Sequence, residues 1–352
     1  MVSNMSKIDK TNLKVFDNLS PYSNNESINF NSFGSDKIFE VLSQNSEATL
    51  GAWLKLQQSW CNEAFKKFKD YDTYLILIYL ISKVWKSYSD RFIFLSMEEF
   101  YSKKEVAIDK INLIGISLEL EIPKETVRRK INFLQKKGII SRKGKSIFIN
   151  QTAFSIQKPT SALAWLANYL EKNSIVLSKN TWFGRPFEKI EIENFIKKYF
   201  TICWEHFFRL QIPFLVRHRA LFGDLETWNV WGSIGISQYI DFTKILKNDV
   251  TDNTPKNYQD LLYRFLTHKI KIGINATSIS EISQIPRATV IRKLKVLLKK
   301  KFIRKNEKME YFLTNTLSNL KSFEKVYALN QKKQSLFVTI IFDLMKKSKF
   351  KI

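Results

Sequence analysis

The sequence is poor in the residues that serve redox chemistry, metal binding and acid–base catalysis. Its 352 residues include two cysteines, Cys61 and Cys203, and three histidines. Two cysteines cannot build a disulfide framework, so we expect a reducing compartment. Cys203 and His206 form a lone Cys-x-x-His pair, and residues 232–235 (GSIG) lack the Lys-Ser/Thr of a phosphate-binding loop. The sequence therefore predicts no enzyme, no catalytic residue, no metal site and no cofactor.

Long apolar runs are also missing. The most apolar stretch, Tyr74–Val84, is too short to span a bilayer and is flanked by Asp72 and Lys86. A buried helix explains it better. The N-terminus is polar from Met1 onward and shows no secretory signal. We expect a soluble, cytoplasmic protein without a membrane partner, associated with the nucleoid if its source is prokaryotic.

Acidic residues are scarce beside basic ones. The chain has 33 Asp and Glu against 57 Lys and Arg, which gives a formal net charge of +24 and a pI near 9.8. Such a balance points to a polyanionic partner, first nucleic acid and second an anionic membrane surface. Part of the lysine excess fits an AT-rich coding sequence. The placement of the charge is more informative, because arginine and lysine cluster in two similar stretches.

The first of these stretches is residues 111–150. It predicts a short helix, a tight turn, a longer basic helix and a small β-hairpin. Pro123 suits a first helical position, where its missing N–H costs nothing, and Gly138 suits the end of the helix. Between them an apolar stripe recurs at helical spacing, formed by Val127, Ile131 and Leu134.

The second stretch, residues 274–314, repeats this pattern. Ile285 stands for Ile122 and Ile303 for Ile140, at a constant offset (285 − 122 = 163 and 303 − 140 = 163). A gap of about one residue falls only in the hairpin, where length is free to vary. Two copies in register argue against coincidence.

Both stretches resemble winged helix-turn-helix transcriptional regulators of the MarR and GntR kind. There I-P-x-x-T-V-x-R-K, a following leucine and isoleucine, and a basic hairpin are typical. The resemblance covers about forty residues in each half. It implies a mainly α fold with two winged units in tandem on helical scaffolds, and double-stranded DNA as the partner. Glu121 and Gln284 depart from the pattern, because a glycine often stands there.

The resemblance places the DNA contacts on the second helix and the hairpin of each unit. On the helices these are Lys124, Glu125, Thr126, Arg128, Arg129, Asn132, Arg287, Thr289, Ile291 and Arg292. On the hairpins they are Arg142, Lys143, Lys145, Arg304, Lys305 and Lys308. The alternative for each helix is a solvated basic face on a packing module.

A comparison of the two copies separates the roles of these residues. Thr126 and Arg129 recur as Thr289 and Arg292 and suit contacts to phosphates. Glu125 and Arg128 give way to Ala288 and Ile291. Arg128 could read guanine, whereas Ile291 could touch only a thymine methyl. We therefore expect the units to read different half-sites.

The remaining sequence suggests four parts. A disordered arm at 1–48, with a short helix around 37–42, precedes a scaffold and first unit at 49–180, an aromatic-rich middle or linker at 181–257, and a second unit with a C-terminal helix at 258–352. Tyr258–His268 is expected to be the first helix of the second unit. Ser96 followed by Glu99 predicts a capping box.

The aromatic middle allows two interpretations. Its tryptophans could wall a small-molecule effector site or fill a core, and helical spacing favours the core. They are Trp182, Trp204, Trp228 and Trp231, of which the last two precede Gly232 in a loop-like segment. His218 lies in an Arg-His-Arg run that is expected to form an anion-facing surface.

The favoured function is sequence-specific DNA binding by a transcriptional regulator. One alternative is a plasmid-type replication initiator, which also carries two winged domains in one chain and binds repeated origin sequences. Another is a structural adaptor whose units bind protein. Whether the chain forms a homodimer or senses an effector stays open.

Overall fold

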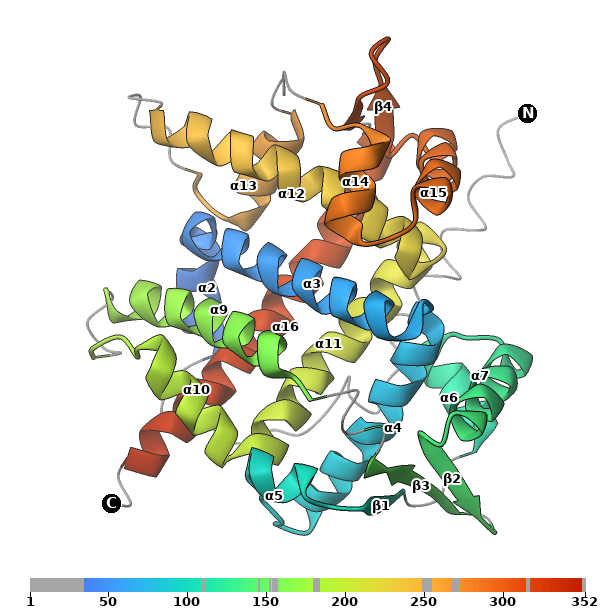
Figure 1. Cartoon of the computed structure of the whole chain (residues 1–352). Helices are drawn as coiled ribbons and strands as arrows, with labels where there is room; N and C mark the ends of the chain where they lie inside the picture. Colours follow the sequence, from blue (N-terminus) through green and yellow to red (C-terminus); the bar gives the residue numbers. More distant parts are fainter. Residues whose placement is uncertain are drawn as a thin grey trace, which may run out of the picture.

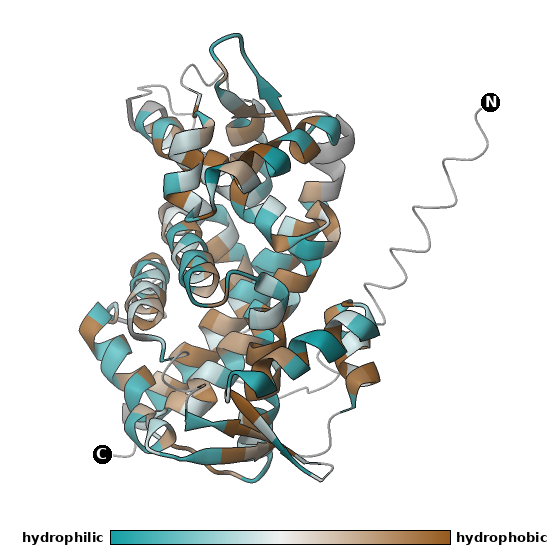
Figure 2. Ribbon diagram, turned by 45° about the vertical axis from the view of Figure 1, so that its right-hand side comes forward, coloured by the Kyte–Doolittle hydropathy of each residue, from teal (hydrophilic) through white to brown (hydrophobic). Residues whose placement is uncertain are grey.

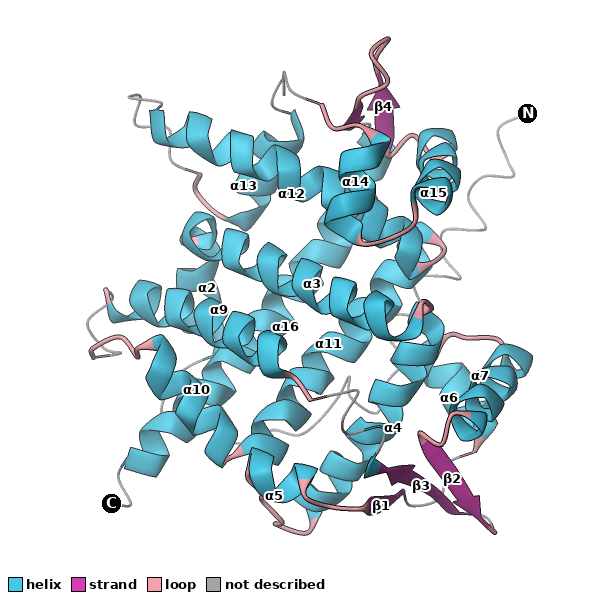
Figure 3. Ribbon diagram, in the orientation of Figure 1, coloured by secondary structure: helices cyan, strands magenta, loops and turns pink. Residues whose placement is uncertain are grey.

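A computed structural model describes residues 35–108, 112–144, 146–151, 153, 158–179, 184–248, 255–267, 273–314 and 317–349. Over these residues the chain is mainly α-helical, with five short antiparallel strands (Figure 1, Figure 3). The prediction of a mainly α fold is confirmed.

The first half contains α2 (Ser35–Gln44), α3 (Ser46–Phe68), α4 (Tyr71–Asp90), α5 (Met97–Tyr101), β1 (Glu105–Ile108), α6 (Leu113–Leu120), α7 (Lys124–Lys136), β2 (Ile140–Lys143), β3 (Ser146–Asn150) and α9 (Thr160–Ser178). The second half contains α10 (Lys189–Lys198), α11 (Phe200–Phe222), α12 (Leu225–Asn248), α13 (Tyr258–Thr267), α14 (Ala276–Ser283), α15 (Arg287–Lys299), β4 (Ile303–Lys305), β5 (Tyr311–Leu313) and α16 (Leu317–Lys349). The strands form one sheet in the order β1-β3-β2 and a separate β4-β5 pair.

The prediction of a disordered N-terminal arm over residues 1–48 was too long. Residues 1–34 lie outside the described part, but residues 35–48 form α2 and the start of α3. Three apolar side chains of α2 are buried, namely Ile38, Val41 and Leu42. They lie on the helix that packs against α9 and α16, so burial of apolar surface orders this segment.

The predicted capping box at Ser96 is confirmed, because Ser96 and Glu99 exchange both hydrogen bonds.

The helical framework is built twice, with its copies 154 residues apart. α2 and α10 begin at Ser35 and Lys189, and α3 and α11 at Ser46 and Phe200 (189 − 35 = 154 and 200 − 46 = 154). Both pairs also end 154 residues apart. The duplication therefore extends beyond the two stretches that resemble each other in sequence.

The turn after each long helix follows the same offset. Lys69 (φ 55°) and Gly223 (φ 95°) end α3 and α11 with a positive φ, and each N–H donates to the carbonyl four residues earlier. The next residue, Asp70 or Asp224, accepts a hydrogen bond from the N–H three residues on. These aspartates are the N-caps that start α4 and α12.

Side chains of α3 and α11 meet in reciprocal pairs. Gln57 donates to Gln211 over 2.9 Å, and Gln211 donates back over 2.8 Å. Two neighbouring ring contacts are reciprocal in the same way. The ring centre of Trp53 in α3 lies 5.4 Å from that of Phe214 in α11, and the ring centre of Trp60 in α3 lies 5.3 Å from that of Phe207 in α11. Gln57 and Gln211 are 154 residues apart, and the same offset relates Trp53 to Phe207 and Trp60 to Phe214, so the two ring contacts are exchanged by a pseudo-two-fold axis that passes between the glutamines.

The last helix of each half, α9 or α16, packs on helices of both halves. α9 packs on α3 of its own half and on α10 of the other, and α16 packs on α11 and on α2. The ring pairs Trp53–Tyr169 (5.2 Å) and Phe207–Phe337 (5.8 Å) are equivalent parts of these contacts. α4 packs on α11, and α12 on α3. Each half therefore completes the core of the other.

One prediction about the second half was wrong. The helix that supports α14, α15 and β5 is α12, just as α4 supports α6, α7 and β1. We expected Tyr258–His268 to do this, but α13, which covers all of it except His268, packs on α3 and α16. His268 itself lies outside the described residues. α13 takes the place in the second half that α5 takes in the first, because α13 packs on α3 and α5 packs on α11, each the long helix of the other half.

The aromatic middle is not a separate piece. Its helices α10–α12 are the second copy of the framework, and Trp228, Trp231 and Gly232 lie inside α12 and not in a loop. Both indoles are only 7% exposed and pack on Phe214 and Phe222. This burial outweighs the low helix propensity of glycine. Trp204 is also buried, and Trp182 lies outside the described residues.

Candidate nucleic-acid interface

The turn between α6 and α7 is built from side chain–backbone bonds. Asn112 caps α6 by accepting the N–H of Gly115, and α6 ends at Glu121, which has a φ of 54°. The Ser117 hydroxyl donates to the carbonyl of Ile122 over 2.6 Å. Pro123 is the N-cap of α7 with a ψ of 135°, one residue before the first helical position that the sequence predicted for it.

The turn between α14 and α15 has the same construction, 163 residues later. Asn275 caps α14, and Gln284 ends it with a φ of 60°. Ser280 donates to the carbonyl of Ile285, again over 2.6 Å. Glu121 and Gln284, which depart from the glycine of the winged-helix pattern, thus adopt the left-handed conformation that the glycine would have allowed.

An apolar stripe fixes which face of each second helix is free. The predicted stripe of α7 is buried, and α15 buries the equivalent one; their members are Val127, Ile131, Leu134, Val290, Leu294 and Leu297. In both units the opposite face carries the predicted polar and basic side chains.

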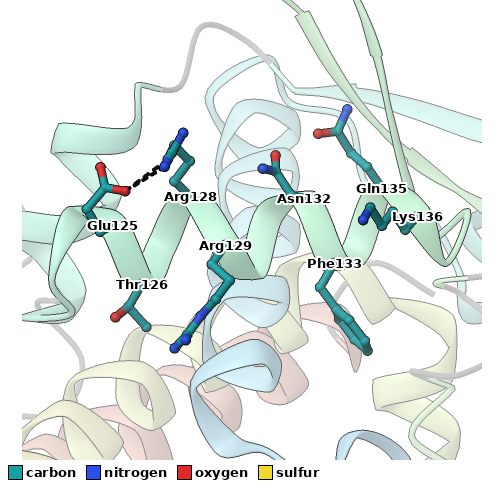
Figure 4. A pocket seen from close by; sticks show the side chains of 8 residues that line it. All are labelled: Glu125, Thr126, Arg128, Arg129, Asn132, Phe133, Gln135 and Lys136. Atoms are coloured by element: carbon teal, nitrogen blue, oxygen red, sulfur yellow. Dashed lines mark hydrogen bonds and ion pairs between the residues drawn. The ribbon is translucent and has the colours of Figure 1, made fainter.

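On α7 these side chains form two rows (Figure 4). Glu125, Arg128 and Asn132 point to one side of the helix, whereas Thr126 and Arg129 point to the other. All are exposed except Thr126, which is half-buried, and Lys124 is exposed at the first position of the helix. They border an open hollow of about 810 Å³ whose described lining comes entirely from α7. The helix therefore presents an accessible face that is polar apart from the exposed ring of Phe133.

Arg128 and Glu125 form an ion pair on this face. The Arg128 Nη2 and a Glu125 carboxylate oxygen are 2.8 Å apart, and both side chains are more than 60% exposed. An exposed pair of this kind contributes little to stability. Its guanidinium and carboxylate can therefore be redirected to a ligand at low cost.

The equivalent face of α15 is less polar. Arg287 and Arg292 are exposed and Thr289 is half-buried, but Ile291 is half-buried and packs in part against the core. Arg287 also donates to the Thr277 hydroxyl of α14 over 3.2 Å. Ile291 therefore offers less surface to a partner than the sequence comparison assumed.

A lysine ties each second helix to its supporting helix. Lys130 Nζ lies 2.6 Å from an Asp70 carboxylate oxygen, and Lys293 Nζ lies 2.7 Å from Asp224. These aspartates are the N-caps of α4 and α12, so each carboxylate serves two elements. The sequence did not reveal this pairing. Its signal is the repeated Asp-x-Asp/Glu-Thr at residues 70–73 and 224–227.

The first turn, and the end of α14 just before the second turn, are also held by the long helix of the other half. Arg219 of α11 donates to the carbonyl of Glu121 over 2.9 Å and pairs with Asp72 at 3.0 Å. Asn62 of α3 donates to the carbonyl of Ile282 over 2.6 Å. The first turn and the end of α14 are thereby fixed to the shared framework.

The hairpins carry basic residues in varied surroundings, and the tip of the β4–β5 hairpin is hydrophilic (Figure 2). Lys143 pairs with Glu105 at 2.8 Å, and the Arg304 guanidinium lies 4.1 Å from the Phe312 ring centre. Arg142, Lys305 and Lys308 are exposed. Lys145 lies outside the described residues.

The Arg-His-Arg run around His218 does not form the expected anion-facing surface. His218 is fully buried, and burial lowers its pKa to about 3. Arg217 is buried against Asn330, and Arg219 is tied to Asp72. α11 lies at the centre of the molecule, where helices cover it on several sides.

The described residues offer neither a cluster of metal ligands nor a membrane-spanning helix. No three His, Cys, Asp or Glu side chains gather as metal ligands in the described part of the chain. None of the described helices has the length and apolar character needed to cross a bilayer. Cys203 is buried, and burial lowers the pKa of the neighbouring His206 to about 4.

No protein-family model matches the chain, and neither a curated protein nor a solved structure matches it. Its function has to be inferred from the two units themselves.

Proposed function

We propose that the chain is a sequence-specific double-stranded DNA-binding protein that uses two winged helix-turn-helix units and acts as a transcriptional regulator. One observation carries the proposal. The same cap, left-handed turn residue and second helix with a polar, basic outer face occur twice, at equivalent positions of the framework. Proteins of the winged class lay such a helix in the major groove and place the hairpin along the backbone.

The two rows of α7 suit different contacts. Thr126 and Arg129 would hold phosphates and fix the register on the duplex. Glu125 and Arg128 would meet base edges, where a carboxylate accepts from cytosine and a guanidinium bonds guanine. The exposed ion pair between them would open on binding.

Arginine removal in each unit tests the proposal. We expect Arg129→Ala and Arg292→Ala each to weaken binding to a genomic target roughly tenfold, the value of a charge-assisted hydrogen bond of about 1.5 kcal/mol. Each should also reduce the slope of log affinity against log salt by about one. Lys37→Ala removes an exposed charge from α2 and is the matched control. Fluorescence anisotropy across a salt series measures both quantities.

Genome-wide binding of the native chain separates the rival functions. Discrete promoter peaks that are lost in both arginine variants support the regulator. Peaks confined to direct repeats at an origin favour a replication initiator. Absence of DNA binding, or affinity that ignores salt, would leave the protein-binding adaptor and contradict the proposal.

A further inference from the structure

The axis between the halves also relates the two DNA-binding units that we have proposed. Gln57 and Gln211 mark this axis by their reciprocal hydrogen bonds. α4 and α12 start at equivalent aspartates 154 residues apart and carry α7 and α15 through the same lysine–aspartate pair. The rotation that exchanges the halves therefore also exchanges α7 and α15.

The two units are attached to one framework by contacts from both halves of the described chain. Arg219 of the second half holds the turn of the first unit, and Asn62 of the first half holds α14 of the second unit. α9 and α16 cross between the halves. Figure 1 shows α7 and α15 along the same, right-hand edge of the molecule. Their relative orientation is thus set by the core.

If a two-fold axis relates the two helices that contact DNA, they run along the duplex in opposite directions, because the axis of the protein coincides with a local dyad of the DNA. Helices related by translation would meet it in the same sense and read direct repeats. The arrangement within this chain is the first kind, which normally requires two copies of a protein.

We infer that a single chain recognises one inverted pair of half-sites, and that the two half-sites differ in sequence. This inference rests on the proposed function and adds the orientation of the half-sites, their fixed spacing and a stoichiometry of one chain per site. Spacing is fixed at a whole number of helical turns, since both helices lie on one edge.

The half-sites differ because the base-facing rows differ. Glu125, Arg128 and Asn132 of α7 correspond to Ala288, Ile291 and Lys295 of α15 (288 − 125 = 163). The first row supplies a carboxylate acceptor and a forked donor, which suit cytosine and guanine, and an amide, which suits adenine. The second supplies a methyl, a half-buried aliphatic chain and one ammonium. The bound site is therefore an imperfect palindrome.

The test selects sites from random duplex DNA with the full-length chain and then rebuilds the selected halves in four duplexes. These hold the halves inverted, direct, inverted with five base pairs inserted, and the stronger half alone. We expect the inverted duplex to bind one chain by native mass spectrometry. Reversal or insertion should lower the affinity to that of the single half, a loss on the order of 100-fold, because a rigid chain cannot engage both halves.

Two matched variants assign the halves to the units. Arg128→Ala should relax sequence selection in one half only, and Lys295→Ala in the other only. Equal binding to the direct duplex, tolerance of the insertion, or two chains on one inverted site would overturn this inference while leaving the proposed function intact. No binding to any selected DNA would overturn both.

Discussion

Two buried glutamines show how a pseudo-symmetric chain handles polar groups on its axis. Gln57 is 4% exposed and Gln211 is fully buried, yet each amide group donates to the other. A buried amide without a partner loses its hydrogen bonds to water and gains nothing in return. On a two-fold axis, one residue type can supply both donor and acceptor, so the pair satisfies itself.

Leucine substitutions test the reciprocal hydrogen bonding of Gln57 and Gln211. Gln57→Leu or Gln211→Leu alone should lower the free energy of unfolding by about 1–3 kcal/mol, because the remaining amide is left unpaired. The double variant should lose less than the sum of the two, since no polar group then stays buried without a partner. Urea unfolding of the four proteins in this cycle measures the coupling.

Gln44 offers the control for this cycle. It is exposed on α2, so Gln44→Leu combined with Gln57→Leu should give an additive change. Additivity between Gln57→Leu and Gln211→Leu themselves would contradict the reciprocal pair.

At the scale of elements, the sequence predicted features that depend on neighbouring residues better than contacts between residues far apart in the chain. Pro123 and Pro286, with their apolar stripes, predicted α7 and α15 because capping and periodicity are encoded within a few residues. The same local logic failed for α12, where two buried indoles override Gly232. The Lys130–Asp70 anchor was missed because its partners are 60 residues apart (130 − 70 = 60).

Glu226, which lies beside the Lys293–Asp224 pair of the second unit, is expected to make the stability of the chain depend on pH. Burial and the nearby Asp224 carboxylate raise the pKa of Glu226 from 4.5 to about 7. Between these values the folded chain holds a proton that the unfolded chain has released, so stability falls as the pH rises through this window. Glu226→Gln cannot ionise and should be more stable than the native chain above pH 7, by up to about 3 kcal/mol, with little difference below pH 4.5.

Urea unfolding at pH 4.5, 6 and 8 measures this difference. Glu281→Gln changes the same charge at an exposed position of α14 and serves as the control. A Glu226→Gln effect that is equal at all three values would show that the carboxyl group is not the source.

At the scale of the whole molecule, the duplication was only half visible in the sequence. The two units align because capping and turn chemistry restrict their residues. The framework does not, because a core accepts any residue of suitable volume and polarity. Trp53 and Phe207 occupy equivalent places, as do Trp60 and Phe214. The offset also changes from 154 to 163 between framework and units, which conceals a single repeat from any ungapped comparison.

The interlocked halves should not fold apart. α9 packs on α10 and α16 packs on α2, so a separated half exposes the apolar face that its partner covers. We expect fragments 1–179 and 180–352, produced singly, to aggregate or to lack a cooperative thermal transition. Produced together with a tag on one, they should co-purify as a one-to-one complex with the helical content of the intact chain, measured by circular dichroism. A soluble, monomeric half that unfolds cooperatively would contradict this, and would make the units independent domains whose mutual orientation the core does not fix.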